Sequence, residues 1–263
     1  MSEAEAALKT IIIDRAFGAS GDRALVEERL TGQEASIMVI ATGEKIIAMP
    51  PVQDHKRAFD GDKGPNTGGM GCYTPVPVVP AALHQEMLET AIYPILQWFG
   101  IKGMPYLGCL YAGLMFTPDG PKVLEYNCRF GDPETEVVLP MLQSDIGEIM
   151  VSAVGNTLDE IRPSWYDGCG VCVVLASGGY PGQYQTGFPI SGIDAAACAD
   201  NTSVYHAGTT QRDGRVVTSG GRVLCVTALG NDFPDARKRV YDACSNIHFD
   251  GMFYRKDIGV RAL

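Results

Sequence analysis

The segment Lys122–Glu134 constrains the fold of this chain more than any other stretch. Apolar and polar side chains alternate over residues 124–127, and this period of two is typical of a β-strand with one covered face. Asp132, Pro133 and Glu134 then provide a capping residue, a proline and an acid, the order found at the start of an α-helix. The segment therefore predicts a strand that ends close to a helix N-terminus.

The polar side chains of this strand suggest a metal site. Glu125 and Asn127 share one face, while Leu124 and Tyr126 point to the other. Two oxygen ligands about 6–7 Å apart along the strand suit Mg²⁺, which binds few protein oxygens and completes its shell with water and phosphate. Arg129 continues the alternation and would place a permanent positive charge where a phosphoryl group passes from ATP to a carboxylate. The alternative is an exposed strand face with ordinary polar residues.

Hydrophobic periodicity and turn residues predict the surrounding elements. Strands are expected at 24–28, 34–40, 45–49, 108–116, 122–127, 171–176, 204–207, 215–218 and 222–229. Helices are expected at 3–13, 80–99, from 132 onward, 145–154 and 234–245. The stretch Gln53–Cys72 is polar and rich in glycine, so it is predicted to be a long functional loop.

Composition excludes several function classes. The net charge of -10 and the pI of about 4.8 argue against a general nucleic-acid surface, which depends on clustered Lys and Arg. No apolar run approaches the roughly 18 residues of a membrane helix, and the first residues do not resemble a secretion signal. The 8 cysteines show no disulfide framework, and Cys169 and Cys172 lie in an apolar run that reads as a buried strand. We therefore expect a cytoplasmic protein without nucleic-acid or membrane partners.

Five motifs give the chain a specific resemblance. The pattern Glu125-x-Asn127-x-Arg129 after a hairpin resembles the metal-binding strand of ATP-grasp ligases. The longer string Asn127–Glu134, N-C-R-F-G-D-P-E, resembles the signature of the phosphoribosylamine–glycine ligase family. Further matches lie at 53–57 (Q-D-H-K-R), 64–71 (G-P-N-T-G-G-M-G) and 254–258 (Y-R-K-D-I). The similarity runs in the same order over essentially the whole chain.

The resemblance implies an α+β fold class, with a partial ATP-grasp fold followed by a small mixed α/β C-terminal domain. Residues 1–45 would form part of the small ATP-grasp subdomain. Residues 46–162 would form the large subdomain with the metal and substrate site, and residues 163–263 the C-terminal domain. The pattern of predicted elements changes near Pro163, where short strands separated by glycine turns begin.

The resemblance also implies the nucleotide site. In ATP-grasp enzymes the base contacts the strand that links two subdomains, and 26–30 (V-E-E-R-L) matches that linker. Glu27, Glu28, Arg29 and Leu30 would thus contact adenine, and Glu34 would bind the ribose. Without the resemblance, Glu27 and Glu28 read as a solvated acidic surface.

The remaining implied residues would handle phosphate and carboxylate groups. Glu125 and Asn127 would bind Mg²⁺, or Mn²⁺ in its place. The residues expected to act in catalysis are Arg129, Asp132, Lys56 and Arg57. Those expected to bind substrate are Asp54, Asn66, Thr67, Gly68 and Gly69. His55 is interpreted as a structural hydrogen-bonding residue.

The implied reaction transfers the γ-phosphoryl group of ATP to the carboxylate of glycine, which gives glycyl phosphate. The amine of 5-phosphoribosylamine then attacks, so that glycinamide ribonucleotide, ADP and phosphate are formed in purine biosynthesis. Family members also have an N-terminal domain and a glycine-rich loop with a phosphate-binding lysine, which this sequence does not contain. We therefore expect weak or no activity from this chain alone, and a longer polypeptide could join it to later domains of the pathway. Alternatives are another carboxylate–amine ligase of this fold, a non-catalytic module or a nucleotide sensor.

Overall fold

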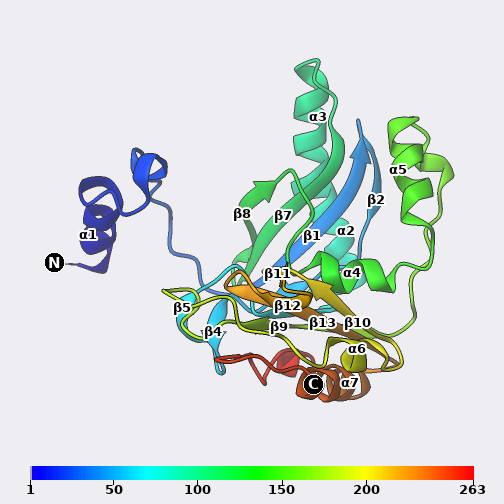
Figure 1. The fold of residues 1–263 in the computed structure, drawn as a ribbon. Helices are drawn as coiled ribbons and strands as arrows, with labels where there is room; N and C mark the ends of the chain where they lie inside the picture. Colours follow the sequence, from blue (N-terminus) through cyan, green and yellow to red (C-terminus); the bar gives the residue numbers. More distant parts are fainter. Residues whose placement is uncertain (1) are drawn as a thin grey trace. The chain divides into compact units, whose positions relative to one another are not determined.

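The computed structural model describes residues 2–263, which fall into two compact units divided between Thr31 and Gly32 (Figure 1). In the smaller unit, α1 (Glu3–Leu8) continues into a π-helical turn, η1 (Lys9–Ile13). The Ser2 hydroxyl accepts a hydrogen bond from the Glu5 backbone N–H, and the Glu5 carboxylate accepts one from the Ser2 N–H. This reciprocal cap stabilises the first turn, and the helix predicted at 3–13 is confirmed.

The strand predicted at 24–28 is wrong. These residues follow a short 3₁₀ turn, η2 (Gly18–Gly21), and belong to no helix or strand. A β-strand is stabilised by hydrogen bonds to a neighbouring strand, and residues 2–31 contain no strand that could pair with it. Leu25 and Val26, the apolar residues that suggested a strand, are 82% and 77% exposed.

The larger unit begins with a four-stranded antiparallel sheet in the order β2-β1-β7-β8. Its strands are β1 (Gln33–Thr42), β2 (Lys45–Ala48), β7 (Leu107–Thr117) and β8 (Gly120–Asn127). The strands predicted at 34–40, 45–49, 108–116 and 122–127 are confirmed and form two hairpins, because β1 pairs with β2 and β7 pairs with β8.

Helices cover one face of this first sheet. They are α2 (Ala81–Met87), the π-helical turn η3 (Leu88–Ile92) and α3 (Tyr93–Ile101), so the helical segment predicted at 80–99 is confirmed. Ile37 and Val39 of β1 pack in the core beneath these helices. Met38 and Ile40, which alternate with them, lie in a second core on the opposite face.

A second sheet has the order β10-β13-β9-β6-β3. Its strands are β3 (Gln53–Asp54), β6 (Gly71–Thr74), β9 (Cys169–Ala176), β10 (Thr202–His206) and β13 (Arg222–Gly230). Helix α7 (Phe233–Asn246) covers one face and appears beneath the sheet in Figure 1. The other face shares a core with the first sheet, so Cys169 and Cys172 are buried on opposite sides of β9.

The predicted long loop at 53–72 contains regular structure and therefore needs correction. Its ends are β3 and β6, which pair with each other, and its middle is a small hairpin of β4 (Arg57–Phe59) and β5 (Lys63–Asn66). Short strands satisfy the backbone hydrogen bonds of a segment that has few apolar side chains. A second hairpin, β11 (Thr209–Arg212) and β12 (Arg215–Thr218), lies later in the chain.

The helix predicted to open at Asp132 begins later. Helix α4 spans Thr135–Met141 with Glu134 at the N-cap position, because Asp132 is bound elsewhere by Arg222. The helix predicted at 145–154 is confirmed as α5 (Ile146–Val154), and the Asp145 carboxylate caps it by accepting hydrogen bonds from the N–H groups of Gly147 and Glu148.

The remaining short helices are α6 (Ile193–Ala197), η4 (Leu158–Glu160) and η5 (Val260–Ala262). The domain boundary near Pro163 stays a prediction, and strands from both sides of that residue, β6 and β9, pair within the second sheet. Among residues 2–263, none of the helices has the length and apolar character needed to cross a membrane.

Candidate active site

The polar end of β8 lies on the face of the first sheet that is opposite to α2 and α3. Asn127 is the cross-strand partner of Tyr111, and Glu125 is the partner of Gly113, so these side chains share a face. The Asn127 amide donates a hydrogen bond of 3.0 Å to Glu125 Oε1, which confirms the predicted common face. Tyr126 points the other way and donates to the carbonyl of Ala91 in η3.

Arg129 does not continue this alternation. Strand β8 ends at Asn127, and Arg129 lies in the following bend, where it is exposed and donates to the carbonyl of Phe130. Its charge still acts on the same face of the sheet. Burial raises the pKa of Cys109 to about 12, and the Arg129 guanidinium opposes this rise.

Glu134 is a buried carboxylate that the sequence analysis treated only as a helix-cap acid. It is 2% exposed and accepts hydrogen bonds from Tyr111 Oη at 2.9 Å and from Ser36 Oγ at 3.2 Å. Burial and the neighbouring Glu134 charge both raise the pKa of Tyr111, so its hydroxyl remains a proton donor. Ser36 and Tyr111 lie on the same sheet face as Glu125, a pattern that could have pointed to this cluster.

A buried ion pair lies next to Glu134. Lys56 Nζ is 2.8 Å from Asp54 Oδ2, and the Asp54 side chain is 2% exposed. Burial raises the pKa of Asp54 to about 7, although the Lys56 charge opposes this shift. Burial also lowers the pKa of Lys56, but the charges of Asp54 and Glu134 outweigh it and the net shift is upward. The site thus contains two carboxylates and one ammonium group.

The glycine segment approaches this ion pair closely. The Thr67 hydroxyl donates to the Lys56 carbonyl at 2.8 Å and accepts from the Gly69 N–H at 2.9 Å. Gly69 has a φ of +117°, and a Cβ there would lie 2.5 Å from Pro133 Cδ and 2.8 Å from Asp54 Oδ2. Only glycine allows the backbone to reach the carboxylate in this way.

Two residues from the C-terminal half of the chain hold Gly68. The Arg222 guanidinium donates to the Gly68 carbonyl at 2.8 Å, and to the carbonyl and carboxylate of Asp132, both at 3.0 Å. The hydroxyl of Tyr180 accepts a hydrogen bond of 3.0 Å from the Gly68 N–H. Neither residue could be predicted from local sequence patterns, because both lie more than a hundred positions along the chain from Gly68.

A pocket of about 500 Å³ opens beside the ion pair. It is lined by Gly32, Gln33, Glu34, Asp54, Lys56, Arg57, Asp62, Asn66 and Arg261. The structure therefore brings together five of the predicted site residues, Glu34, Asp54, Lys56, Arg57 and Asn66. Glu125, Asn127, Arg129 and Asp132 are not part of this lining, and the pocket includes Asp62 and Arg261, which were not predicted.

The predicted adenine-binding residues 27–30 lie in the smaller unit, in the segment without regular structure that precedes Gly32. Glu34 is the second residue of β1 and lines the pocket of the larger unit. The contacts of these residues with a nucleotide stay predictions.

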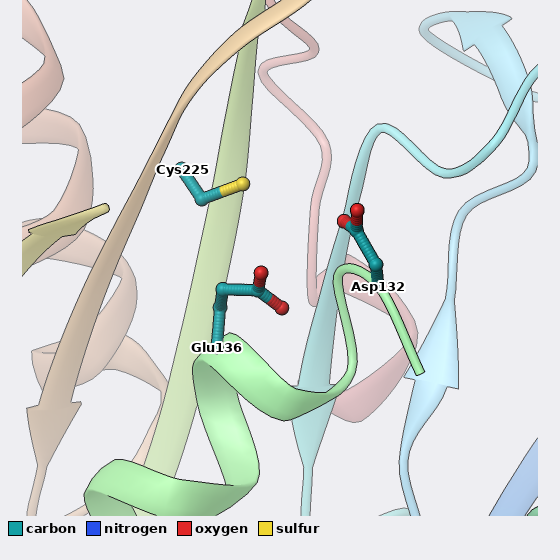
Figure 2. Close-up of side chains that lie close together, drawn as sticks. All are labelled: Asp132, Glu136 and Cys225. Carbon is teal, nitrogen blue, oxygen red and sulfur yellow. The ribbon is translucent and has the colours of Figure 1, made fainter. Parts of the chain in front are cut away.

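Asp132 belongs to a second acidic cluster. One ligand atom each from Asp132, Glu136 and Cys225 lies within 4.8 Å of the others, and Figure 2 shows the three side chains turned toward one another. Burial raises the pKa of Glu136 to about 7, with a further contribution from the Asp132 charge. Arg222 forms an ion pair with Asp132, so this ion pair and the raised pKa of Glu136 account for the cluster.

The Glu136→Gln variant is expected to be more stable than the parent protein at pH 8.5 and equally stable at pH 5. The folded-state pKa of Glu136 lies above the unfolded value, so its contribution to stability is present at low pH and is lost as the pH rises through about 7. With a discount for partial solvent exposure, we expect about 1 kcal/mol, or a gain of roughly 2–4 °C in Tm. Thermal unfolding at both pH values tests this, with the exposed Glu148→Gln as control; equal gains at both would contradict it.

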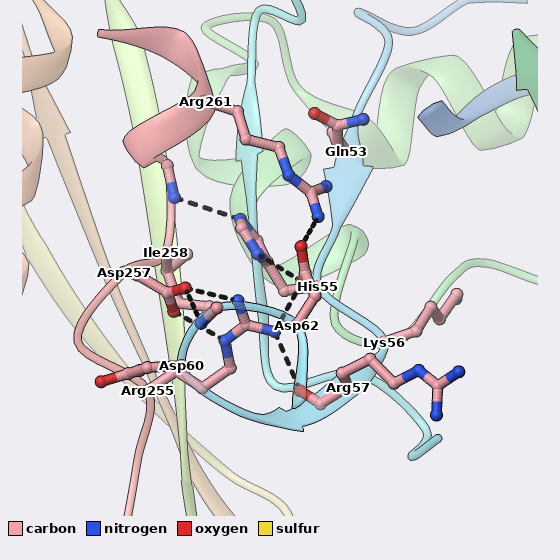
Figure 3. Close-up of polar contacts among 12 residues, drawn as sticks. Gln53, His55, Lys56, Arg57, Asp60, Asp62, Arg255, Asp257, Ile258 and Arg261 are labelled. Atoms are coloured by element: carbon pink, nitrogen blue, oxygen red, sulfur yellow. Dashed lines mark hydrogen bonds and ion pairs between the residues drawn. The ribbon is translucent and has the colours of Figure 1, made fainter. Parts of the chain in front are cut away.

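The C-terminal tail binds the small β4–β5 hairpin through a buried arginine (Figure 3). Arg255 is 1% exposed and makes two hydrogen bonds of 2.7 Å to the Asp257 carboxylate. It also donates at 3.0 Å to Asp62 Oδ1 and to the Arg57 carbonyl. Arg261, from the same tail, forms an ion pair with the other oxygen of Asp62.

His55 is enclosed by this network. It is 2% exposed, and its Nε2 accepts a hydrogen bond of 3.3 Å from the Gly259 N–H. Burial lowers the pKa of His55 to about 3, and the charges of Arg255 and Arg261 lower it further against Asp257 and Asp62. A neutral ring that accepts a backbone hydrogen bond agrees with the predicted structural role.

This arrangement of two sheets defines an ATP-grasp protein. A family model described as phosphoribosylglycinamide synthetase, ATP-grasp (A) domain, matches residues 1–135. A second model, described as the C domain of the same synthetase, matches residues 170–261. The chain belongs to the phosphoribosylglycinamide synthetase family, and the resemblance seen in the sequence is confirmed.

Individual relatives agree with this assignment. A phosphoribosylamine–glycine ligase from Vibrio parahaemolyticus is 47% identical over the whole of this chain, which spans 61% of that protein's length. The trifunctional purine biosynthetic protein adenosine-3 from Gallus gallus is 49% identical over 99% of this chain, which covers 26% of it. The crystal structure of phosphoribosylamine–glycine ligase from Thermotoga maritima has a TM-score of 0.78 and 36% identity, and the match covers 88% of this chain and 57% of that one.

Proposed function

We propose that this chain belongs to an ATP-dependent ligase that joins glycine to 5-phosphoribosylamine through glycyl phosphate, giving glycinamide ribonucleotide, ADP and phosphate. The observation that supports this most is the position of the buried Asp54–Lys56 pair beside Glu134 and the glycine segment, in a chain whose relatives are phosphoribosylamine–glycine ligases. The Gallus gallus relative is described as trifunctional, which supports a fusion to later purine-pathway domains in some members.

Glu125 and Asn127 are the residues that would hold a divalent metal ion. Their side chains offer oxygen atoms on one face of β8, which suits a hard cation such as Mg²⁺ or Mn²⁺. When bound, such an ion neutralises charge on the phosphate oxygens of ATP.

Residues of this chain would then position the glycine carboxylate, which accepts the phosphoryl group, and the amine, which attacks the acyl phosphate. Lys56 and Arg129 carry permanent positive charge, as the transfer of a phosphoryl group to a carboxylate requires. The Gly69 N–H is held by Thr67, and its backbone lies close enough to Asp54 to shape the substrate site. The Asp54 carboxylate, with its raised pKa, can accept the proton that the amine loses when it attacks the acyl phosphate. Phosphate leaves as the amide bond forms.

The function is tested by glycine-dependent ADP formation in the presence of 5-phosphoribosylamine and Mg²⁺. We would measure it for this chain and for a chimera that adds the remaining part of the Vibrio parahaemolyticus relative. The variant Glu125→Ala in the active form is expected to lose activity by about 100-fold, as expected for a group that stabilises transition-state charge. The exposed Glu86→Ala should retain full activity.

The assay separates the alternatives. ADP formation that depends on a different amino acid would identify another carboxylate–amine ligase. Absence of ADP formation in the chimera, together with retained nucleotide binding, would identify a binding module. Either result would overturn the proposed function, whereas a glycine-dependent activity that survives Glu125→Ala would overturn only the metal site.

A further inference from the structure

The pocket beside β3 is lined by two separate groups of charges. One group is the ion pair of Asp54 with Lys56, whose strongest electrostatic partners are each other and Glu134. The other group is Arg261 with Asp62, which belong to the network of the C-terminal tail. A ligand that carries opposite charges at its two ends would match such a pocket.

The arginines of the tail group act on the groups around them. The guanidinium groups of Arg255 and Arg261 face the carboxylates of Asp62 and Asp257. Arg57, whose backbone carbonyl accepts a hydrogen bond from Arg255, adds a further positive charge to the pocket lining. The Arg255 and Arg261 charges lower the pKa of the buried His55 ring after burial itself, so the local field disfavours a further cation. The same field favours an anion.

Two of these guanidinium groups have donors directed away from their protein partners. Arg255 uses four of its five N–H donors to bind Asp257, Asp62 and a backbone carbonyl. Arg261 forms its ion pair with Asp62 through one nitrogen, Nη2, and its side chain is 34% exposed. Arg57 donates through Nη1 to the Gly64 carbonyl. Both line the pocket, and a guanidinium group suits a phosphate because it offers parallel N–H donors.

The tail arginine is held in place by its neighbours. Arg255 anchors the segment before it, and the Gly259 N–H is bound to His55. Arg261 therefore enters the pocket on a short, fixed segment of η5, and not on a loose chain end. Preorganised donors lose little freedom on binding, which favours ligand affinity.

We infer that Arg261 and Arg57 form a subsite that binds the 5-phosphate group of the amine substrate, a sugar phosphate. The C-terminal tail completes this subsite by supplying Arg261. The inference rests on the proposed function. It assigns a ligand-binding role to a tail motif that the reaction scheme does not otherwise use. The Asp54–Lys56 pair then faces the amine end of the same molecule.

Calorimetric titration of ribose 5-phosphate into this chain tests the inference without requiring turnover. We expect binding of ribose 5-phosphate, displacement by inorganic phosphate at higher concentration, and no binding of ribose. Arg261→Gln should weaken the affinity by about 10- to 100-fold, as expected for the loss of a charged hydrogen-bond donor. Arg261→Lys should have an intermediate effect.

Arg57→Gln provides a second variant, because Arg57 is exposed and its loss does not disturb the buried tail network. Arg239→Gln, which removes a partly exposed arginine of α7, is the matched control and should bind as the parent does. No binding by the parent chain, or equal binding by the parent and both pocket variants, overturns the inference. If ribose 5-phosphate binds through Arg261 while the chimera shows no glycine-dependent ADP formation, the subsite stands and the proposed function fails.

Discussion

Replacing Arg255 with methionine is expected to destabilise the larger unit by about 3 kcal/mol, because it removes the cation that pairs with the partly buried Asp257 carboxylate. Arg255 is 1% exposed and bridges Asp257, Asp62 and the Arg57 carbonyl. Methionine fills similar volume without charge, so the loss reports the ion network more than a cavity. The variant tests whether the tail is fixed to the β4–β5 hairpin by this one side chain.

The pH dependence of this loss has a defined sign. The Arg255 guanidinium holds the pKa of Asp257 below its ordinary value, although burial acts in the opposite direction. A carboxylate with a lowered folded-state pKa contributes stability above its unfolded value, and this stability disappears as the pH falls through the folded value. The difference between the parent and Arg255→Met should therefore be largest near pH 7 and smaller below about pH 4.

Urea unfolding at pH 7 and pH 3.5 measures this difference. Arg239→Met is the control, because Arg239 pairs with Asp235 on α7 with side chains that are 35% and 31% exposed, and such pairs contribute at most about 1 kcal/mol. A loss below 1 kcal/mol for Arg255→Met would show that the tail network is not a stabilising element.

The fold could be predicted from sequence where pattern and partner lie close together. The hairpins around Gly43 and Gly120 follow from local turns and alternation, and both pair as expected. The predicted strand at 24–28 failed because a strand depends on a partner that local pattern does not specify. The helix start at Asp132 failed because Arg222, ninety residues later, binds the carboxylate that would have capped it.

The candidate site could be predicted only in part, because some of its residues meet only through contacts between distant parts of the chain. Glu125 and Asn127 share a face because a strand has a period of two, so their relation is local and is confirmed. Tyr180 and Arg222 approach Gly68 only through the tertiary fold, and no periodicity of the sequence indicates this. Arg261 likewise reaches the pocket through contacts that the tail makes with Asp62.

Lys56→Met is expected to destabilise the protein by about 3 kcal/mol at pH 8.5, with most of this loss recovered at pH 5.5. This loss of stability lies at the lower end of the range expected when a buried ion pair is broken. The reason is that the Lys56 side chain is 37% exposed, while that of Asp54 is 2% exposed. Without the ammonium group, Asp54 and the neighbouring Glu134 are left as buried carboxylates with no cation between them.

The sign follows from the pKa of Asp54, which burial already raises to about 7 in the parent. Loss of the Lys56 charge removes the largest opposing effect, so the folded-state pKa should rise further. A carboxyl group whose pKa is raised in the folded state destabilises the protein least at low pH, where it is protonated. The free energy of unfolding falls as the pH rises through that pKa. Stability measured by urea unfolding at both pH values should show this recovery.

The double variant Lys56→Met with Asp54→Asn separates charge from packing. It removes both members of the pair, so at pH 8.5 it should be more stable than Lys56→Met alone, by about 2 kcal/mol. If the loss in Lys56→Met is the same at pH 5.5 and pH 8.5, and Asp54→Asn restores nothing, then lost contacts of the Lys56 side chain cause the destabilisation. In that case the Asp54 carboxylate is not the group that Lys56 stabilises, and its proposed role as proton acceptor loses its electrostatic basis.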